Sequence, residues 1–316
     1  MEAKGSHSGA RNTNPGFRED SRGLTPASEI TLEYVSPPQS LHPFVTTFYY
    51  FRCDEEQIRD IQPAAVGSLM VYLHGEGVMH FEKHSDRSHP VSLLAPLTYA
   101  AHFEVDGPFH CIGASLSPLG WASLTGMPAN KARDRLTNAS DVLGEEVVRL
   151  GEELRRDYRA QACEPADLCD RLAEFLAARL RPVTARHVQL ISAVAEWLSS
   201  SYNPDIAMLA DATGYSIRQV QRLVERYFGV APKLLIRKYR ALRVVALLHD
   251  PTTTEEQVAD LLNQFYDQSH LIREVRLFAG RTPSRFGDSE SPILERLLDV
   301  RNFREIKPNV APLPDE

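Results

Sequence analysis

The stretch that decides the fold of this 316-residue chain is SIRQVQRLVERYFGVAP, residues 216–232. Apolar residues recur in it at the three- and four-residue spacing of a helix that buries one face. Ser216 stands where a helix N-cap is expected, and Gly229 stands where the chain must leave the helix. We therefore predict a helix over residues 216–228. The residues of its inner face are Val220, Leu223, Val224, Tyr227 and Phe228.

A shorter helix precedes this one and meets it at a sharp turn. Asp205 is placed as an N-cap before the apolar run from Ile206 to Leu209. Gly214 lies between the two helices, where the backbone needs a positive φ that glycine adopts at little cost. Residues 205–229 thus predict a helix-turn-helix unit.

The same plan recurs in residues 255–283. Its predicted parts are a first helix over Glu255–Leu262, a turn at Gln264-Phe265-Tyr266, and a second helix from Gln268 that Asp267 caps. The segment GRTP at 280–283 ends this unit as GVAP at 229–232 ends the first. Two helices with Arg and Gln, each followed by such a stop, are hard to explain by chance.

Lys233–His249 lies between the two units and is predicted to form a single helix. At about 1.5 Å per residue, this helix is about 25 Å long. It can therefore carry two recognition helices to successive major grooves on one face of DNA, which lie about 34 Å apart.

The outer faces of the two recognition helices carry side chains that can read base edges. Arg bridges O6 and N7 of guanine, Gln bridges N6 and N7 of adenine, and further Arg residues hold phosphates. A solvated helix face without a partner is the alternative interpretation of the same residues. The candidate DNA-contacting residues are Ser216, Arg218, Gln219, Gln221, Arg222, Gln268, Ser269, His270, Arg273 and Arg276.

The distribution of charge favours a nucleic-acid partner although the whole chain has a net charge of −7. Residues 1–184 hold 18 basic against 25 acidic side chains, residues 185–287 hold 13 against 10, and residues 288–316 hold 4 against 7. The basic excess therefore lies in the segment with the two units, as expected of a DNA-binding part.

The composition is typical of a globular protein, and we expect the chain to remain in the cytoplasm. The chain is 43% apolar and 24% charged, and it lacks an apolar run of about 18 residues, so we expect no membrane partner. The first 24 residues lack the apolar core of a secretory signal. The four cysteines have the spacing of neither a zinc site nor a redox pair, and we interpret them as small apolar fillers.

Several stretches of the C-terminal segment resemble the AraC/XylS family of transcription regulators. They are YFGVAP at 227–232, RALRVVALL at 240–248, DQSHLIR at 267–273 and GRTPSRF at 280–286. The resemblance covers about 100 residues and implies a sequence-specific regulator that binds double-stranded DNA, forms a homodimer, and contacts RNA polymerase if it is an activator. By position it implies a structural role for Arg243 and base or phosphate contacts for Arg218, Gln221, Arg222, Gln268, Ser269, His270 and Arg273.

Two departures from the family pattern occur, and both lie in the second unit. Gln264 stands where the family has glycine before Phe265, and Val275-Arg276 stands where it has Phe-Lys. The resemblance therefore supports base reading by the first unit more fully than by the second.

Residues 30–117 predict a β-rich domain. Apolar or alternating runs are separated by turn formers at residues 37–38, 74–77 and 106–108, and their spacing favours a small barrel or sandwich. Of the two we predict a cupin-like barrel. The predicted strands are Phe44–Phe51, Ser68–His74, Val91–Ala95, Tyr99–Val105 and Phe109–Leu116. Two amphipathic helices follow, with apolar stripes of Val147, Leu150, Leu154 and Tyr158, and of Leu168, Leu172, Phe175, Leu176 and Leu180.

The resemblance implies that the β-rich domain binds a small-molecule effector or mediates dimerisation, and the two amphipathic helices predict a dimer seam that includes Leu150 and Leu154. Aromatic residues that could line an apolar pocket are Phe48, Tyr49, Tyr50, Phe51, Tyr72, Tyr99 and Phe103. Six histidines between His74 and His110 raise the alternative of a metal-cupin enzyme fused to a DNA module. No His-x-His pair with a following Glu is present, so we expect no metal, cofactor or catalysis. Control by a protein partner or by dimerisation without a ligand is the other alternative.

The chain is thus predicted to be an α+β protein with four parts. They are a disordered tail over 1–28, an effector-sensing or dimerisation domain over 29–182, a DNA-binding double helix-turn-helix domain over 186–287, and a C-terminal tail over 288–316. Arg181-Pro182-Val183-Thr184 breaks the helical pattern between the two domains.

Overall fold

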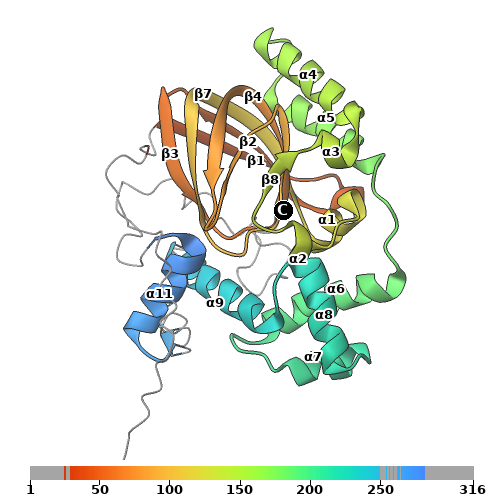
Figure 1. Cartoon of the computed structure of the whole chain (residues 1–316), viewed down its shortest axis with the longest axis vertical. Helices are drawn as coiled ribbons and strands as arrows, with labels where there is room; N and C mark the ends of the chain where they lie inside the picture. The colour runs from red at the N-terminus through yellow and green to blue at the C-terminus, as the bar shows by residue number, and fades with distance from the viewer. Residues whose placement is uncertain are drawn as a thin grey trace, which may run out of the picture.

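The structure, a computed structural model, describes Thr25, residues 29–249, Thr254, Glu256, Ala259, Leu262, Asn263 and residues 265–281. The predicted tails lie outside these residues, apart from Thr25, and so do Gln264 and most of the predicted helix 255–262. The described chain is α+β, with an antiparallel sheet followed by helices (Figure 1). Its strands are β1 Ile30–Val35, β2 Val45–Cys53, β3 Gln57–Gln62, β4 Gly67–His80, β5 Ser85–Arg87, β6 Val91–Leu94, β7 Ala101–Leu116 and β8 Leu136–Asn138.

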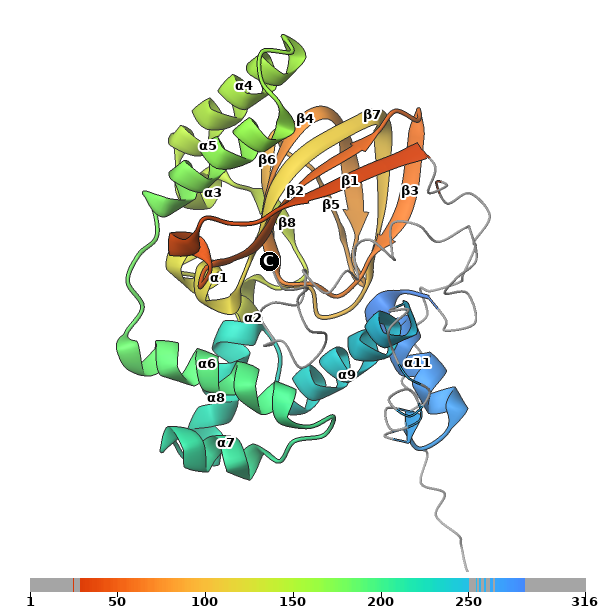
Figure 2. The same ribbon diagram turned by 180° about the vertical axis from the view of Figure 1, so that it is seen from behind.

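The predicted β-rich domain is a strongly curved eight-stranded antiparallel sheet that does not close into the predicted cupin-like barrel (Figure 2). The strand order is β1-β2-β7-β4-β6-β8, with β3 paired to β7 and β5 paired to β4, and the end strands β1 and β8 do not pair with each other. The long strands β4 and β7 form the spine. One edge of β7 pairs with β2 along residues 109–116 and with β3 along residues 101–106. Because the two halves of this edge of β7 pair with different strands, the sheet folds over on itself without closing.

The two turns predicted at residues 74–77 and 106–108 are bends inside these long strands. The register between β4 and β7 shifts around His74, and Glu76 then lies opposite Asp106. Gly75 has a φ of +77°, a conformation that glycine adopts at little cost. β4 and β7 therefore bend together at this point. The sequence pattern that predicted two turns corresponds to a β-bulge in the paired strands.

Alternation along the strands gives the sheet two apolar faces. On β2, Phe48 and Tyr50 pack towards the helices, whereas Phe51 and Cys53 face the inside of the curve. The helices that cover the outer face, as Figures 1 and 2 show, are α1 Pro118–Thr125, α4 Glu145–Arg159 and α5 Pro165–Ala177. Shorter elements are η2 Gln39–Leu41, α2 Ala129–Ala132 and α3 Ser140–Leu143.

The apolar stripes of α4 and α5 pack on their own sheet. Leu154 is fully buried with Val147 and Leu172 in the core between the helices and the sheet, and Leu150 is partly buried against the same core. The predicted dimer seam is therefore wrong for Leu154, because the side chain that it needs is already covered within the chain.

The C-terminal helices form a second core that continues into the sheet domain. They are α6 Ala185–Ser200, α7 Ile206–Thr213, α8 Ile217–Phe228, α9 Pro232–His249 and α11 Gln268–Ala279. The core residues of α8 and α11, such as Val224 and Phe278, lie in one cluster with Ala64 and Leu119 of the sheet domain. None of the described helices is long and apolar enough to cross a membrane.

Candidate nucleic-acid interface

The first helix-turn-helix unit is built as the sequence predicts. Asp205 caps α7 by accepting a hydrogen bond from the amide of Ala207 at 3.0 Å. Gly214 ends that helix with a φ of +66°. Ser216 caps α8 in a capping box with Gln219, so the start of the recognition helix is fixed by local hydrogen bonds.

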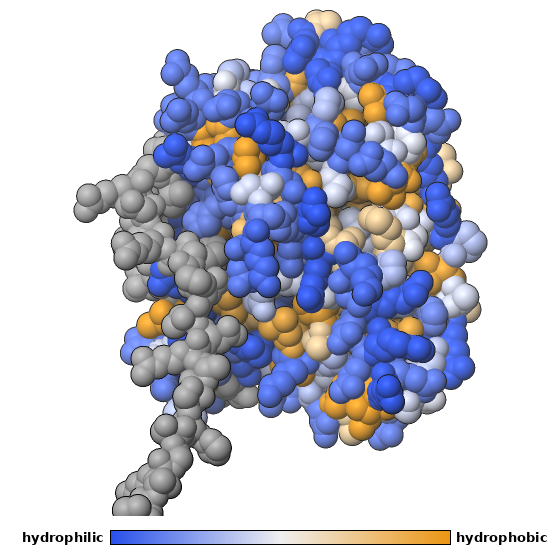
Figure 3. All heavy atoms as spheres, in the orientation of Figure 1, coloured by the Kyte–Doolittle hydropathy of each residue, from blue (hydrophilic) through white to orange (hydrophobic). Residues whose placement is uncertain are grey.

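The outer face of α8 is open to solvent. Arg218, Gln219, Gln221 and Arg222 are exposed along it, while the predicted inner face is buried. Gln219 Oε1 accepts hydrogen bonds from the amide and the hydroxyl of Ser216, at 3.0 Å each, so these two predicted DNA contacts also serve the cap. Hydrophilic residues dominate this side of the molecule, with small apolar groups between them (Figure 3).

Two exposed apolar side chains in this unit were missed as candidates from the sequence. Met208 is 60% exposed and Ile217, the first residue of α8, is 46% exposed. The sequence pattern placed Met208 in an apolar run, and the short α7 turns it to solvent instead. Apolar side chains of this kind contact the methyl group of thymine in the major groove.

The second unit is described from Phe265 onward, so the prediction about Gln264 lies outside the described residues. Asp267 caps α11 by accepting a hydrogen bond from the amide of His270 at 2.7 Å, as predicted. Gln268, Ser269 and Arg273 are exposed. His270 and Arg276 are half-buried, and the ring of His270 packs on Phe265.

A buried carboxylate joins α11 to the long helix α9. Glu274 is 2% exposed and accepts hydrogen bonds from Arg237 Nε at 2.6 Å and from Arg240 Nη2 at 2.8 Å. His270 Nε2 lies 3.2 Å from the same carboxylate. Burial raises the pKa of Glu274, but the hydrogen bonds and charges of the two arginines outweigh burial and lower it. The orientation of the second recognition helix therefore depends on an ionised Glu274.

Arg243, also on α9, has the structural role that the resemblance implies. It is 7% exposed and donates to the backbone carbonyls of Leu198 and Ser201, which lie at the C-terminal end of α6. This contact ties the long helix to α6, the helix that precedes the first unit.

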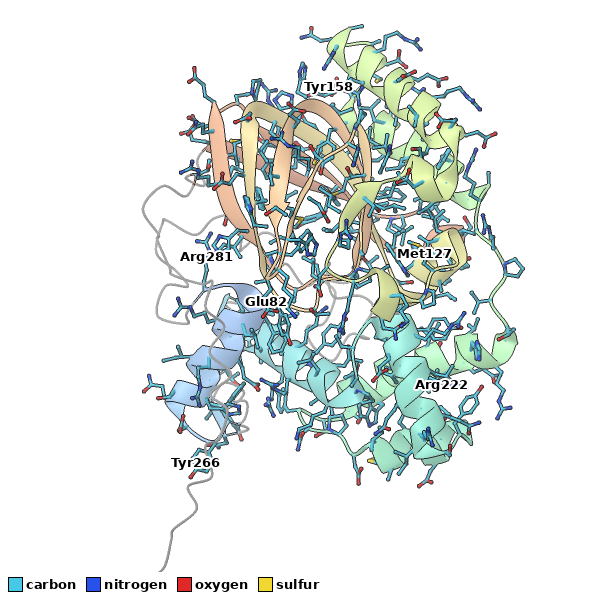
Figure 4. The ribbon with its side chains drawn as sticks, viewed as in Figure 1. Glu82, Met127, Tyr158, Arg222, Tyr266 and Arg281 are labelled. Atoms are coloured by element: carbon cyan, nitrogen blue, oxygen red, sulfur yellow. The ribbon has the colours of Figure 1, made fainter. Side chains whose placement is uncertain are left out.

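Both recognition helices meet the sheet domain at their C-terminal ends. Behind α8, Arg133 donates to the carbonyl of Gly229 at 3.1 Å. Behind α11, the amide of Ala64 donates to the carbonyl of Phe278 at 2.7 Å, and the amide of Ala100 donates to that of Leu277 at 3.1 Å. Figure 4 shows Tyr266 at the end of α11 away from the sheet and Arg281 at the end beside it. The N-terminal ends, which enter a major groove in helix-turn-helix proteins, thus point away from the sheet.

Three buried charged side chains take part in this contact. Arg281 and Asp60 form an ion pair in which the side chains are 5% and 0% exposed. Lys238, 4% exposed, donates to the carbonyls of Ala65 at 3.3 Å and Leu97 at 3.0 Å. Neither contact was predicted, because Asp60 and Arg281 are 221 positions apart and nothing local marks them as partners.

A cavity of about 140 Å³ lies inside the curve of the sheet. Of the aromatic residues singled out in the sequence, Tyr49, Phe51, Tyr72 and Phe103 line it. Phe48 and Tyr50 face the helices instead, and Tyr99 stacks on Phe278 of α11. The predicted pocket is therefore present, with every second aromatic residue of β2 on its wall.

The histidine-rich stretch does not gather into one cluster. No group of three or more His, Cys, Asp and Glu side chains that could hold a metal ion occurs within the described part of the chain. His110 donates or accepts at both ring nitrogens, 2.7 Å from Asp54 Oδ1 and 2.8 Å from the hydroxyl of Tyr158. Tyr158, labelled in Figure 4, belongs to α4, so this chain of polar groups fastens the helix to the sheet.

Comparison with known proteins gives a family match for the C-terminal part. Residues 209–289 match a model described as a helix-turn-helix domain. Comparison with curated proteins gives no match.

The solved structures that the chain resembles include ToxT from Vibrio cholerae, which is 12% identical, with 82% of this chain and 97% of that chain covered and a TM-score of 0.43. Another is the AraC-like transcriptional activator CuxR, which is 11% identical, with 69% and 87% covered and a TM-score of 0.29. These likenesses are weak.

Proposed function

We propose, from the AraC-type helix-turn-helix domain that spans residues 209–289, that the chain is a cytoplasmic, sequence-specific DNA-binding transcription regulator controlled by a small-molecule effector. The observation that carries the DNA part is the pair of capped helices α8 and α11, each with Arg and Gln on its exposed face. Double-stranded DNA is the partner of both helices. The chain also associates with a second copy of itself as a homodimer. Where it activates transcription, it contacts RNA polymerase.

The two recognition helices take unequal parts in this function. On α8, Arg218, Gln221 and Arg222 are exposed and bonded to no other described residue, so they are available to bases and phosphates. On α11, Gln268, Ser269 and Arg273 are available in the same way. His270 and Arg276 are half-buried, which leaves the second helix fewer groups to read a groove.

The effector part is supported by the position of the cavity. Residues 63–66 connect β3 to β4, and Ala65 and Val66 of this segment line the cavity together with Gln62 at the end of β3. The same segment holds the linker helix α9 and the recognition helix α11, because Ala65 accepts from Lys238 of α9 and Ala64 donates to Phe278 of α11. A ligand that favours one position of this segment therefore acts on both helices, in addition to any effect through the linker. A coupling of about 1–3 kcal/mol would change operator affinity about 5- to 150-fold.

Arg222→Ala is expected to weaken binding to a selected DNA site by about 1–3 kcal/mol, since a base contact of Arg is worth that much. Gln268→Ala is expected to produce a smaller loss, because α11 has fewer available groups. Fluorescence anisotropy titrations of the full chain at fixed salt measure both. Arg149→Ala is the matched control, because Arg149 is 64% exposed on α4, away from both units. Unchanged affinity in both variants would show that the wrong helix faces have been assigned to DNA.

A further inference from the structure

Among the residues that the structure describes, none with a charged side chain lines the cavity. Its polar groups are the hydroxyls of tyrosine and serine residues, the amide of Gln62 and the thiol of Cys111, and the remaining lining is apolar. Burial raises the pKa of Tyr49, Tyr72 and Cys111 above their ordinary values, so these groups stay neutral near pH 7. An anionic or cationic ligand would find no opposite charge there, and an unpaired charge is costly to bury.

One hydrogen-bonding pair inside the cavity has a defined direction. Ser68 donates its hydroxyl proton to the carbonyl of Ala114 at 3.1 Å. Its oxygen, 3.0 Å from the hydroxyl of Tyr49, must then accept the proton of Tyr49. The phenolic oxygen of Tyr49 therefore keeps lone pairs that can accept a hydrogen bond from a ligand. Gly113, opposite Tyr49 on β7, leaves room for this ring, because a Cβ there would come within 2.3 Å of it.

The volume of the cavity suits a small molecule. An apolar protein cavity of about 150 Å³ binds benzene. The cavity in this chain, about 140 Å³, is of that order and is walled by Phe51, Phe103 and Phe109 beside the tyrosines. A single ring with a short substituent fits this volume, whereas a sugar would leave most of its hydroxyls facing carbon.

We propose that the cavity binds a neutral, one-ring phenol or alcohol whose hydroxyl donates to Tyr49, and that it discriminates against carboxylates of the same shape. This rests on the proposed function for the role of the ligand as an effector. The ligand contacts Ala65 and Val66, so it also bears on the segment that holds Lys238 and α11.

Three probes of matched shape test the proposal by calorimetry on the full chain: 4-ethylphenol, ethylbenzene and 4-ethylbenzoate. The phenol is expected to bind best. With a carboxyl pKa of about 4, about one molecule in 1,000 of the benzoate is neutral at pH 7, so its affinity should be about 100- to 1,000-fold weaker. Above this pKa, lowering the pH by one unit should raise the affinity for the benzoate about tenfold.

Tyr49→Phe separates the hydrogen bond from the packing. This variant is expected to bind 4-ethylphenol about threefold to tenfold more weakly than the parent chain, because one hydrogen bond is lost. Ethylbenzene cannot make that bond, so its affinity should stay within about twofold, which also shows that the cavity of the variant is intact.

The proposal is overturned if the benzoate binds as tightly as the phenol at pH 7, or if none of the three probes binds at millimolar concentration. It is also overturned if Tyr49→Phe weakens ethylbenzene and 4-ethylphenol equally. Calorimetry requires no DNA, so these outcomes stand apart from the proposed function, which fails instead if the chain binds no specific duplex.

Discussion

Arg281→Ala is expected to destabilise the contact between α11 and the sheet by about 3–5 kcal/mol, because it leaves the buried carboxylate of Asp60 without its cation. Two backbone amides report this contact directly. The amide of Ala64 donates to Phe278 and that of Ala100 donates to Leu277. Their hydrogen exchange should accelerate by about two to three and a half orders of magnitude, since each 1.4 kcal/mol is tenfold.

Two further variants separate the buried pair from a general loss of charge. Arg59→Ala removes an arginine from the same strand as Asp60, but its ion pair with Glu104 is exposed, so an effect below about 1 kcal/mol is expected. Asp60→Leu combined with Arg281→Met removes both charges and should recover most of the protection. If Arg281→Ala leaves the exchange of both amides unchanged, the pair does not hold the two parts together.

The pH dependence of the Arg281→Ala chain follows from the position of Asp60. Burial raises the pKa of Asp60, and the charge of Arg281 opposes that effect. Without Arg281 the folded pKa rises further above the unfolded value of about 3.9. In this variant the destabilisation caused by the unpaired Asp60 is absent below the unfolded pKa of Asp60 and grows as the pH rises through its folded pKa. The protection of the Ala64 and Ala100 amides from exchange should therefore improve on acidification.

Glu274→Leu is expected to destabilise the second helix-turn-helix unit by about 3–5 kcal/mol, because Arg240 is buried and would lose its carboxylate. Hydrogen exchange of the α11 amides measures this loss. The matched control is Glu153→Leu, which breaks the partly exposed pair with Arg171 and should cost less than about 1 kcal/mol. Equal exchange in the two variants would contradict the role assigned to Glu274.

Acid should produce part of the same effect in the parent chain. The folded pKa of Glu274 lies below the unfolded value of about 4.3, so its stabilisation is fully present above pH 4.3 or so and is lost as the pH falls through the folded pKa. In Glu274→Gln this part of the acid sensitivity should disappear.

Local signals in the sequence were sufficient for the two recognition helices. The caps Asp205, Ser216 and Asp267 and the stops Gly214 and Gly229 all occur as predicted, because each depends on residues within one helical turn. The exposed Arg and Gln of α8 follow from the same helical spacing.

The features that could not be predicted from the sequence depend on contacts between residues that are far apart in the chain. β3 has the sequence QIRDIQ, which gives little apolar signal, and it is a strand because β7 offers an edge. Lys238, Arg240 and Arg243 are ordinarily solvent-exposed residue types, yet all three are buried, because their acceptors come from distant parts of the chain. The barrel was predicted because periodicity indicates that a segment is a strand and does not indicate which strands pair or where the hydrogen bonding between them stops.

The central claim, sequence-specific binding of DNA by both units, is tested most directly by selecting a site from random duplexes. The selected site is then titrated with the full chain beside a scrambled duplex, at several salt concentrations. The selected site should bind at least about 1,000-fold more tightly than the scrambled one, with affinity that falls as salt rises. Footprinting should show two protected segments about one helical turn apart. Equal affinity for the two duplexes, or failure to enrich any sequence, would contradict the claim.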